Sequence, residues 1–290
     1  MPVRIARRVF LAAPLLAAPF LARAGLADDA IAKFTDLEAR NGGRLGVMAF
    51  DTTRGRRVGH RSDERFPICS TFKLLAAALV LARVDRGEEQ LGRRVVYAEK
   101  DVVAYSPVTK DHAGTAGLSV AELCEAAMTQ SDNTAANLLL ASFGGPAALT
   151  AYVRSLGDMT TRLDRIEPDL NEALPDDPRD TTTPAAMVAT MERLLLRAVL
   201  SASSRKMLTG WLVANKTGDK RLRAGLPADW RVGDRTGTGA NGTANDVAIV
   251  WPGDDAPILI AVYYTGSTIS DEARNAVIAE AGGIVAASLK

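Results

Sequence analysis

The sequence has few of the side chains that bind metals or form disulfides. Its 290 residues include 2 Cys and 2 His, and none of the four stands at a CxxC or HxxxH spacing. Cysteine and histidine at such spacings are the usual ligands of zinc, and two cysteines cannot build a disulfide framework. We therefore expect no metal site and no cofactor. With two histidines in the sequence, a mechanism that depends on histidine is not favoured either.

Neither sign of charge is in excess, and the composition is that of a globular protein. The chain has 35 Lys and Arg against 34 Asp and Glu, and 47% of its residues are hydrophobic. A chain of this length can bury one large core or two modest ones. Removing the N-terminal segment considered next takes away four Arg and no acid, which leaves 31 basic and 34 acidic residues and a formal charge near −3. A nucleic acid is therefore not expected as a partner.

The N-terminus lacks a hydrophobic run long enough to span a membrane. The apolar run at 9–22 has 14 residues and two prolines, whereas a spanning helix needs about 20 residues. Arginines precede the run and a small-residue pattern at 22–24 follows it, so we predict a cleaved signal peptide at 1–24 and a periplasmic or secreted protein. The pair Arg7-Arg8 favours twin-arginine export over an ordinary Sec signal. No Cys follows the run, so no membrane anchor is expected.

Hydrophobic periodicity predicts strands near both ends of the chain and helices between them. Predicted strands lie at 45–50, 57–60, 230–233, 245–251 and 258–265, with a short piece near 95–96. Predicted helices lie at 28–41, 71–84, 119–129, 133–143, 147–156, 183–195, 201–212 and 271–289. The sequence therefore predicts an α/β (α+β) fold, in which 25–66 and 214–290 form an antiparallel sheet flanked by helices and 67–213 form an inserted all-helical domain. This insertion contains an irregular loop at 162–180, and the crevice between the domains is the expected site.

A serine and a lysine stand three residues apart at the start of the most apolar helix. Ser70 and Lys73 would lie on one face of that helix, within hydrogen-bond reach of each other. A buried ammonium is costly unless it is paired or used, so Lys73 is a candidate functional residue. The same spacing recurs at Ser203 and Lys206, which we interpret as a solvated helix face.

Three further motifs follow, and each has a structural alternative. The sequence Ser-Asp-Asn at 131–133 is also a good helix N-cap. Glu167 and Asn171 stand four residues apart, so a carboxylate and an amide could together hold a water or could cap a surface turn. The sequence Arg-Thr-Gly-Thr-Gly at 235–239 lies between two predicted strands, and it is either a place where a ligand approaches the backbone or a hairpin turn.

Taken in order, Ser-x-x-Lys, Ser-Asp-Asn, Glu-x-x-Leu-Asn and a basic-Thr-Gly triplet resemble the class A serine β-lactamases. The segments 105–109, 179–182 and 230–239 also read as that family does, so the resemblance covers the whole mature chain. It implies an ion pair between Arg165 and Asp180. It also implies an enzyme that hydrolyses β-lactam antibiotics through a serine acyl-enzyme, which gives antibiotic resistance.

The resemblance implies a role for each motif residue. Ser70 would attack the lactam carbonyl with help from Lys73, and Ser131 would pass a proton to the departing nitrogen. Glu167, with Asn171, would activate the water that hydrolyses the acyl-enzyme, and the base for acylation, Glu167 or Lys73, stays open. Further substrate contacts would come from Tyr105, Asn133, Arg221, Arg235, Thr236, Gly237 and Thr238, with the backbone N–H groups of Ser70 and Thr238 as the oxyanion hole.

Two arginines bear on the choice of substrate. The family usually has Lys at the position of Arg235. An Arg at this position resembles the carbenicillin-hydrolysing branch of the family. We therefore expect penicillins, including carboxypenicillins, and some cephalosporins as substrates, with the substrate carboxylate bound by the charge of Arg235. Arg221 is the candidate for the arginine that the family supplies near its site, and the alternative is an exposed residue in a basic loop.

The resemblance also carries expectations about the cysteines. The apparent match to the usual disulfide partner of Cys124 is Ala77, so Cys69 and Cys124 are expected to be free, buried thiols. Some relatives have a disulfide bridge from the position of Cys69. This chain has Gly239 where those relatives have the partner cysteine, which weakens an inference of carbapenem hydrolysis. The bond before Pro168 matches a peptide that is cis in the family.

Several activities compete with this interpretation. A penicillin-binding D,D-peptidase would share the acylation residues, but Glu167 and Asn171 supply a deacylation step that such a peptidase lacks. A serine-dependent glutaminase of similar fold and a periplasmic β-lactam sensor that acylates without turnover also compete with it. We expect a monomer that acts on small molecules.

Overall fold

The computed structural model describes residues 18–253 and 256–289, with side chains from Asp29 onward. The helices are α1 (Ala18–Asn41), α2 (Phe72–Asp85), α3 (Val120–Gln130), α4 (Asn133–Ser142), α5 (Gly145–Ser155), α6 (Pro184–Leu196), α7 (Ala202–Val213), α8 (Leu222–Gly225) and α9 (Asp271–Leu289). The strands are β1 (Arg44–Asp51), β2 (Arg56–His60), β3 (Phe66–Pro67), β4 (Arg94–Val95), β5 (Leu118–Ser119), β6 (Thr181–Thr182), β7 (Arg231–Gly239), β8 (Thr243–Trp251) and β9 (Ile258–Thr265). Short 3-10 helices are η1 (Cys69–Thr71), η2 (Glu99–Asp101), η3 (Thr109–His112) and η4 (Asp169–Asn171).

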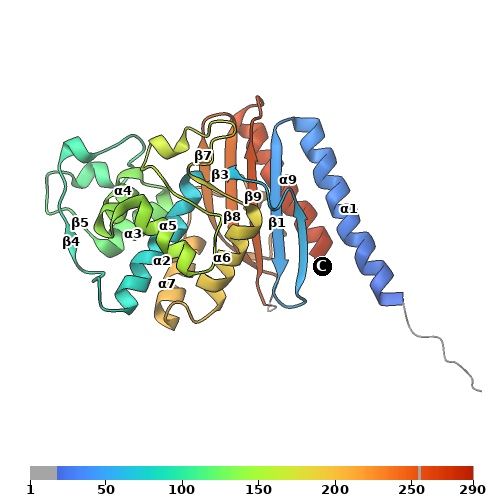
Figure 1. Ribbon diagram of the computed structural model, residues 1–290, viewed down its shortest axis with the longest axis horizontal. Coiled ribbons are helices and arrows are strands. Elements are labelled where there is room, and N and C mark those ends of the chain that lie inside the picture. The colour runs from blue at the N-terminus through green and yellow to red at the C-terminus, as the bar shows by residue number, and fades with distance from the viewer. Residues whose placement is uncertain (1–17, 254–255, 290) are drawn as a thin grey trace, which may run out of the picture.

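Strands from both ends of the chain form one antiparallel sheet in the order β2-β1-β9-β8-β7. β1 pairs with β9 along its whole length, from Arg44 opposite Thr265 to Asp51 opposite Ile258. Helices α1 and α9 lie along one face of this sheet, and α2 to α7 lie on the other side (Figure 1). The predicted fold class, an antiparallel sheet flanked by helices, is confirmed. The domain boundaries at 66/67 and 213/214 stay a prediction.

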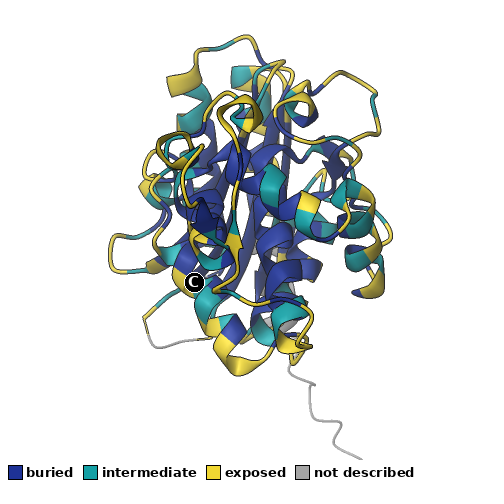
Figure 2. Ribbon diagram, turned by 90° about the vertical axis from the view of Figure 1, so that its left-hand side faces the viewer, coloured by how far each residue is buried: buried dark blue, intermediate teal, exposed yellow. Residues whose placement is uncertain are grey.

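The alternation of side chains along β9 explains why helices cover both faces. One set is buried against α1 and α9, namely Ile258, Ile260, Val262 and Tyr264. The other set is buried against the helices that follow β3, namely Leu259, Ala261 and Tyr263. Successive side chains of a strand point to opposite faces, so a strand that is apolar throughout needs cover on both. In Figure 2 the buried residues accordingly run through the middle of the molecule and the exposed ones follow its outline.

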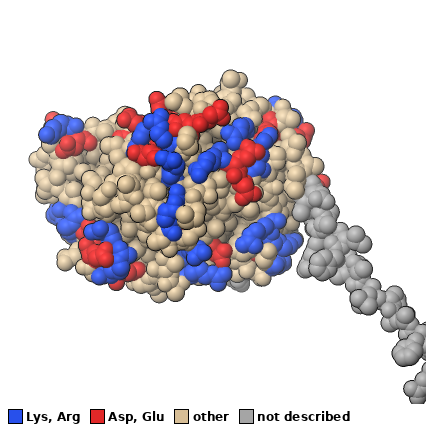
Figure 3. Space-filling view, viewed as in Figure 1, with Lys and Arg blue, Asp and Glu red and all other residues tan. Residues whose placement is uncertain are grey.

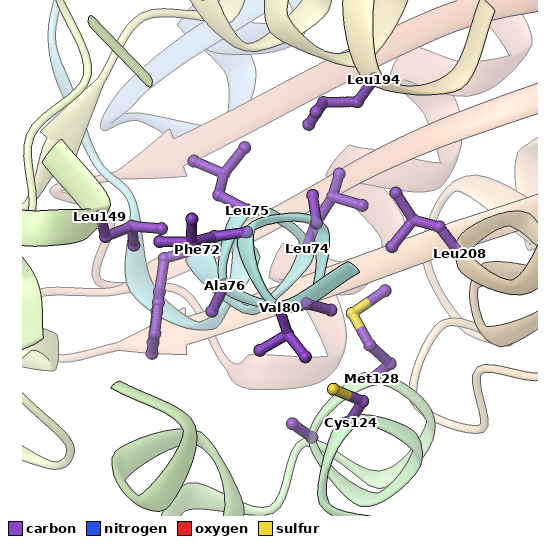
Figure 4. Close-up of a cluster of buried hydrophobic side chains, with 14 of the residues drawn as sticks. Phe72, Leu74, Leu75, Ala76, Val80, Cys124, Met128, Leu149, Leu194 and Leu208 are labelled. Carbon is purple, nitrogen blue, oxygen red and sulfur yellow. The ribbon is translucent and has the colours of Figure 1, made fainter. Parts of the chain in front are cut away.

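Helix α2 lies at the centre of the helical layer. Every residue of this helix at 72–82 is buried. Figure 4 shows its side chains enclosed on all sides by residues of α3, α5, α6 and α7, among them Cys124, Met128, Leu149, Leu194 and Leu208. A helix that is apolar all round is stable only inside a core, where each buried Leu contributes about 1.5–3 kcal/mol. The core therefore fixes the position of the first turn of α2, which carries Lys73.

Most of the long predicted elements agree with the structure to within a few residues, but β7, predicted to end at 233, continues to Gly239, and three of the two-residue strands were missed. The piece predicted near 95–96 is β4, which pairs with β5, and β3 pairs with β6. Strands of two residues have no periodicity that could reveal them. Helix α1 begins at Ala18 rather than at residue 28, and so includes the end of the predicted signal peptide. Residues 1–17 of that segment lie outside the described residues.

The hairpin-turn alternative for 235–239 is wrong. These residues lie inside β7, with Arg235 opposite Val247 and Gly237 opposite Asn245 of β8. The chain turns later, at 240–242. Since β7 is the last strand in the sheet order, one of its edges is left without a partner strand and faces η1.

The surface carries both signs of charge side by side. On the face shown in Figure 3, Lys and Arg groups adjoin Asp and Glu groups in several places. Among the described helices, no single one is long and apolar enough to span a membrane. The pair α4 and α5 meets both criteria when taken together, but it is bent by 74° at the junction.

Candidate active site

Ser70 lies in η1, directly before α2, and its hydroxyl joins two charged side chains. Ser70 Oγ donates to Glu167 Oε1 at 3.0 Å and accepts from Lys73 Nζ at 2.9 Å. The preceding residue, Cys69, has a φ of 43°, and Thr71 Oγ1 donates back to the carbonyl of Ile68 at 2.6 Å. The tight turn thus places the serine at the N-terminal end of α2, where the partial positive charge of a helix favours negative charge.

Lys73 is fully buried and surrounded by oxygen atoms. Its Nζ lies 2.8 Å from the carbonyl of Ser131, 2.6 Å from Asn133 Oδ1 and 3.0 Å from Glu167 Oε1. Burial lowers the pKa of Lys73 to about 8, although the negative charge of Glu167 acts in the opposite direction. An ammonium with such a pKa can lose its proton at mildly alkaline pH. The expectation that Lys73 is buried is confirmed.

The Ser-Asp-Asn motif joins α3 to α4. Ser131 is the C-cap of α3 and has a φ of 60°, and its Oγ lies 3.2 Å from Lys73 Nζ. Asp132 is the N-cap of α4, so the capping role holds for the middle residue of the motif, and its carboxylate also accepts from Thr109 N and Oγ1. Asn133 donates to the carbonyl of Ala104 at 2.9 Å. The motif therefore fixes both its own side chains and the neighbouring loop.

Glu167 reaches Ser70 from the 162–180 loop. Its carboxylate accepts from Asn171 Nδ2, so the predicted carboxylate–amide pair is confirmed. Asn137 of α4 holds the backbone of Glu167 in both directions, with its Nδ2 donating to the carbonyl at 2.8 Å and its Oδ1 accepting from the amide at 2.9 Å. The Glu167–Pro168 bond is cis, as predicted.

Polar contacts close the loop at its base and hold its tip. Arg165 Nε donates to Asp180 Oδ2 at 2.6 Å, so the predicted ion pair is confirmed. The other oxygen of Asp180 accepts from the backbone of Asp164 at 2.7 Å. At the far end, Ala240 N donates to the carbonyl of Asn171 at 2.9 Å.

Arg235 is completely buried under the site. Its Nε donates to the carbonyl of Ser70 at 3.2 Å, its Nη1 to the carbonyl of Met128 at 3.1 Å, and its Nη2 to Ser131 Oγ. Burial lowers the pKa of Arg235 to about 10. Next to it, a Cβ on Gly237 would stand 3.2 Å from Ser70 N, so the absence of a side chain lets β7 approach the nucleophile.

Arg221 is also buried, with 8% of its surface exposed, so the alternative of an exposed loop residue is wrong. Its Nη1 donates to the carbonyls of Gly237 and Asn245, at 2.6 and 2.7 Å, and its Nη2 to Thr238 Oγ1 at 2.7 Å. Burial lowers the pKa of Arg221. Burial likewise raises the pKa of the neighbouring carboxyl of Asp246. Arg221 thus joins the carbonyls of neighbouring strands, Gly237 of β7 and Asn245 of β8, at the edge of the site.

An open cavity of about 530 Å³ lies over Ser70. Its lining consists of Ser70, Tyr105, Ser131, Asn133, Asn171, Lys216, Thr217, Arg221, Thr236, Gly237 and Thr238. Three predicted site residues, Lys73, Glu167 and Arg235, lie behind this wall and touch it through hydrogen bonds. In the part of the chain that the structure describes, no group of three or more His, Cys, Asp or Glu side chains is arranged to hold a metal ion.

Sequence reasoning missed three residues of the site. Asn137 holds the backbone of Glu167, and Lys216 and Thr217 line the cavity. One signal was available, because the sequence at 216–218 is Lys-Thr-Gly, a second basic-Thr-Gly triplet.

The two cysteines are free and buried, as predicted. Burial raises the pKa of both thiols, so neither is a reactive thiolate. A Cβ on Gly239 would stand 2.7 Å from Cys69 Sγ, which shows that this glycine is needed for close packing beside the nucleophile.

Comparisons with known proteins point to one family. A model of the Beta-lactamase enzyme family matches residues 29–289. The chain is similar to the β-lactamase AST-1 of Nocardia asteroides, with 52% identity over 257 residues that cover 89% of this chain and 83% of that protein. It is similar to the β-lactamase L2 of Stenotrophomonas maltophilia, with 47% identity over 297 residues, 97% of this chain and 98% of that protein. Among solved structures, the class A β-lactamase of the last common ancestor of Gram-negative bacteria (GNCA4) has a TM-score of 0.88 and 63% identity, over 92% of this chain and 100% of that one.

Proposed function

Because this chain belongs to the class A β-lactamase family, we propose that it hydrolyses the lactam amide of penicillins and some cephalosporins through an acyl-enzyme on Ser70. The observation that carries this proposal is the hydroxyl of Ser70 between Lys73 Nζ and Glu167 Oε1, at 2.9 and 3.0 Å. A nucleophile with a proton acceptor in direct contact is the arrangement that acyl transfer requires.

In the acylation step, Ser70 Oγ forms a bond to the lactam carbonyl carbon and gives up its proton. Glu167 accepts that proton directly, or Lys73 accepts it when neutral. The carbonyl oxygen becomes negative and is stabilised by the backbone N–H groups of Ser70 and Thr238. The close approach of β7 to Ser70 N at Gly237 supports this oxyanion hole. The carbon–nitrogen bond then breaks, and Ser131 Oγ, which contacts Lys73 and Arg235, supplies a proton to the nitrogen. Ser131 regains a proton from Lys73, which holds the proton of Ser70 or receives it from Glu167, so that Glu167 is again a carboxylate.

In the deacylation step, a water held by Glu167 and Asn171 attacks the ester on Ser70. Glu167 takes a proton from this water, and the proton returns to Ser70 Oγ as the ester bond breaks. This pair of residues distinguishes the proposal from a D,D-peptidase or a sensor, because those proteins form the acyl-enzyme and keep it. Turnover of the antibiotic would give the host resistance.

The substrates that we propose include carboxypenicillins, on the ground that Arg235 resembles the carbenicillin-hydrolysing branch. Tyr105 and Asn133 would contact the side chain of the antibiotic, while Thr236 and Thr238 would contact its ring. We also propose that the protein acts as a monomer outside the cytoplasm after removal of residues 1–24, without a membrane anchor.

The test is steady-state hydrolysis of carbenicillin and of a chromogenic cephalosporin by the purified exported protein, with the intact mass recorded during the reaction. Fast turnover with a transient adduct on Ser70 is the expected result. A lasting adduct without turnover would instead indicate a penicillin-binding protein or a sensor, and no adduct would contradict the proposal at its first step.

A further inference from the structure

A second open cavity, of about 570 Å³, lies at the neck of the 162–180 loop and shares no lining residue with the cavity over Ser70. Three arginines from separate parts of the chain line it: Arg65 directly before β3, Arg154 of α5 and Arg162 at the start of the loop. One acid, Asp164, lines it as well. Three positive charges and one negative charge give this lining a net charge of +2.

Two of these arginines are held in place by neutral oxygen atoms. Arg65 Nη1 donates to the carbonyl of Thr160 and to Thr181 Oγ1, both at 2.9 Å. Arg154 Nη1 donates to two carbonyls, one of which is that of Thr161 at 2.6 Å. Within the described ranges, neither guanidinium forms an ion pair or uses its Nε and Nη2. Each therefore has a fixed position and keeps three of its five N–H groups for a ligand.

The acid of the cavity is already in use. Asp164 accepts from Arg162 Nε at 2.9 Å and from the backbone N–H of Asp180 at 3.0 Å. Its charge therefore compensates Arg162, whose Nη1 makes no hydrogen bond with the part of the chain that the structure describes. The charges of Arg65 and Arg154 are left without a partner in the same cavity.

This arrangement fits a phosphate group better than a carboxylate. Guanidinium groups bind oxyanions through pairs of parallel N–H groups. A phosphate has oxygen atoms in several directions and can meet such pairs from separate elements, whereas the two oxygens of a carboxylate lie in one plane. A phosphate monoester also carries a charge of about −1.5 to −2 at pH 7, which balances the net charge of the lining.

We propose that this cavity is a binding site for a phosphate group, which is received by the free N–H groups of Arg65, Arg154 and Arg162. The same chemistry is present in inorganic phosphate and in a phosphomonoester, so the experiment below includes both. The proposed site lies outside the machinery at Ser70, and phosphate binding there does not depend on the proposed hydrolysis.

A phosphate in this cavity would join the two stems of the 162–180 loop. Arg162 begins the loop, and its backbone N–H donates to the carbonyl of Thr181, after the loop, at 2.9 Å. Arg65 contacts the side chain of the same Thr181. Leu163 is tied to α5 through Thr150, whose Oγ1 accepts from the Leu163 N–H at 3.0 Å. We therefore expect bound phosphate to slow amide hydrogen exchange at the two stems of the loop.

The test is isothermal titration calorimetry of the whole protein with inorganic phosphate and with glycerol 3-phosphate, at an ionic strength kept constant with NaCl. We expect saturable binding by at least one of the two, and the tighter one identifies the source of the phosphate group. At about ten times the Kd, the Tm should rise by about 2–4 °C.

Three variants locate the site. Arg65→Gln, Arg154→Gln and Arg162→Gln should each weaken binding by about 5- to 20-fold, because each removes charge-assisted hydrogen bonds. Arg162→Gln leaves the carbonyl contacts of the other two arginines intact, so it serves if either of those variants fails to fold. Arg154→Lys keeps the charge without the planar fork and should bind with intermediate affinity.

Lys206→Gln is the matched control, because it removes one positive charge from an exposed position outside the cavity. It should bind phosphate like the wild type. Phosphate also stabilises proteins by its exclusion from their surfaces, so an equal rise in Tm for the wild type and the arginine variants would overturn the inference. The absence of saturable binding would overturn it as well. No β-lactam is present in these measurements, so the result is independent of whether the proposed function holds.

Discussion

The two walls that meet at Ser70 are held in place by different forces. One wall consists of Lys73, at the start of α2, and of Ser131 and Asn133, at the junction of α3 and α4. The hydrophobic core surrounds these helices. Glu167 and Asn171 stand on a loop that buries Leu163 and Leu170 in that core and is otherwise held by polar contacts, at Asp180, at Asn137 and at Ala240. Apolar packing opens only with a large part of the fold, whereas a polar loop can open alone. The proposed acylation step is therefore tied to global stability, and the proposed deacylation step is tied to one loop.

The largest expected effect is that of removing the carboxylate of Glu167, which should stop deacylation and spare acylation. The proton of Ser70 has two acceptors in contact, whereas the deacylating water has one proposed base. Glu167→Ala should therefore keep acylation, with Lys73 as the acceptor, and lower turnover by about 10²- to 10⁴-fold. Intact mass spectrometry should show a lasting adduct on Ser70.

The matched control is Asp169→Ala, which removes an exposed carboxylate two residues away. This variant should turn over like the wild type. Turnover by Glu167→Ala at the wild-type rate would contradict the assigned role of this carboxylate.

The next largest effect tests the core wall. Leu75 of α2 is 1% exposed and lies in the cluster of Figure 4. Leu75→Ala should lower the free energy of unfolding by about 2–5 kcal/mol, because it leaves a cavity in the packed helical layer. Thermal unfolding checks this value. The ratio of the acylation rate to the deacylation rate should stay as in the wild type, and a selective loss of deacylation would contradict the comparison of the two walls.

A smaller effect tests the loop wall. Asp180→Ala removes the acceptor of Arg165 and of two backbone amides. We expect deacylation to fall by about 10- to 100-fold, because the base would no longer be held in position, with acylation changed much less. Amide hydrogen exchange should become faster in 162–180 and remain slow in α2. Arg179→Ala, at an exposed site in the same loop, is the control.

The smallest effect concerns pH. Burial brings the pKa of Lys73 to about 8, and the charge of Glu167 keeps it from falling further. Above this pH, Lys73 is neutral and can take the proton of Ser70, so the acylation rate should rise with pH through about 8. In Glu167→Gln the opposing charge is gone, and the midpoint should move to lower pH. Stopped-flow acylation rates measure both profiles, and an unmoved midpoint would indicate that Lys73 is not the acceptor.

The sequence predicted the parts of the fold that have a long, regular pattern. β9 and α9 match their predicted ranges, because a strand buried on both faces and a long helix each leave a clear signature. The strands β3, β5 and β6 were not predicted, since two residues carry no period. The site was predicted by its motifs, which the chain brings together at Ser70 as expected. Burial of Arg221 and exposure of Lys216 depend on how 215–222 lies against β7, and a linear sequence does not contain that contact.

The order of strands in the sheet has a consequence for how the chain folds. β9 lies between β1 and β8, although it is among the last elements to be synthesised. Until the ribosome has released it, the β1–β2 hairpin and the β7–β8 hairpin have no common partner, and closing the pair of Arg44 with Thr265 spans most of the chain. Such long-range pairing makes folding slow. The five-stranded sheet is therefore complete, with β7 beside the nucleophile, only when β9 has joined the two hairpins.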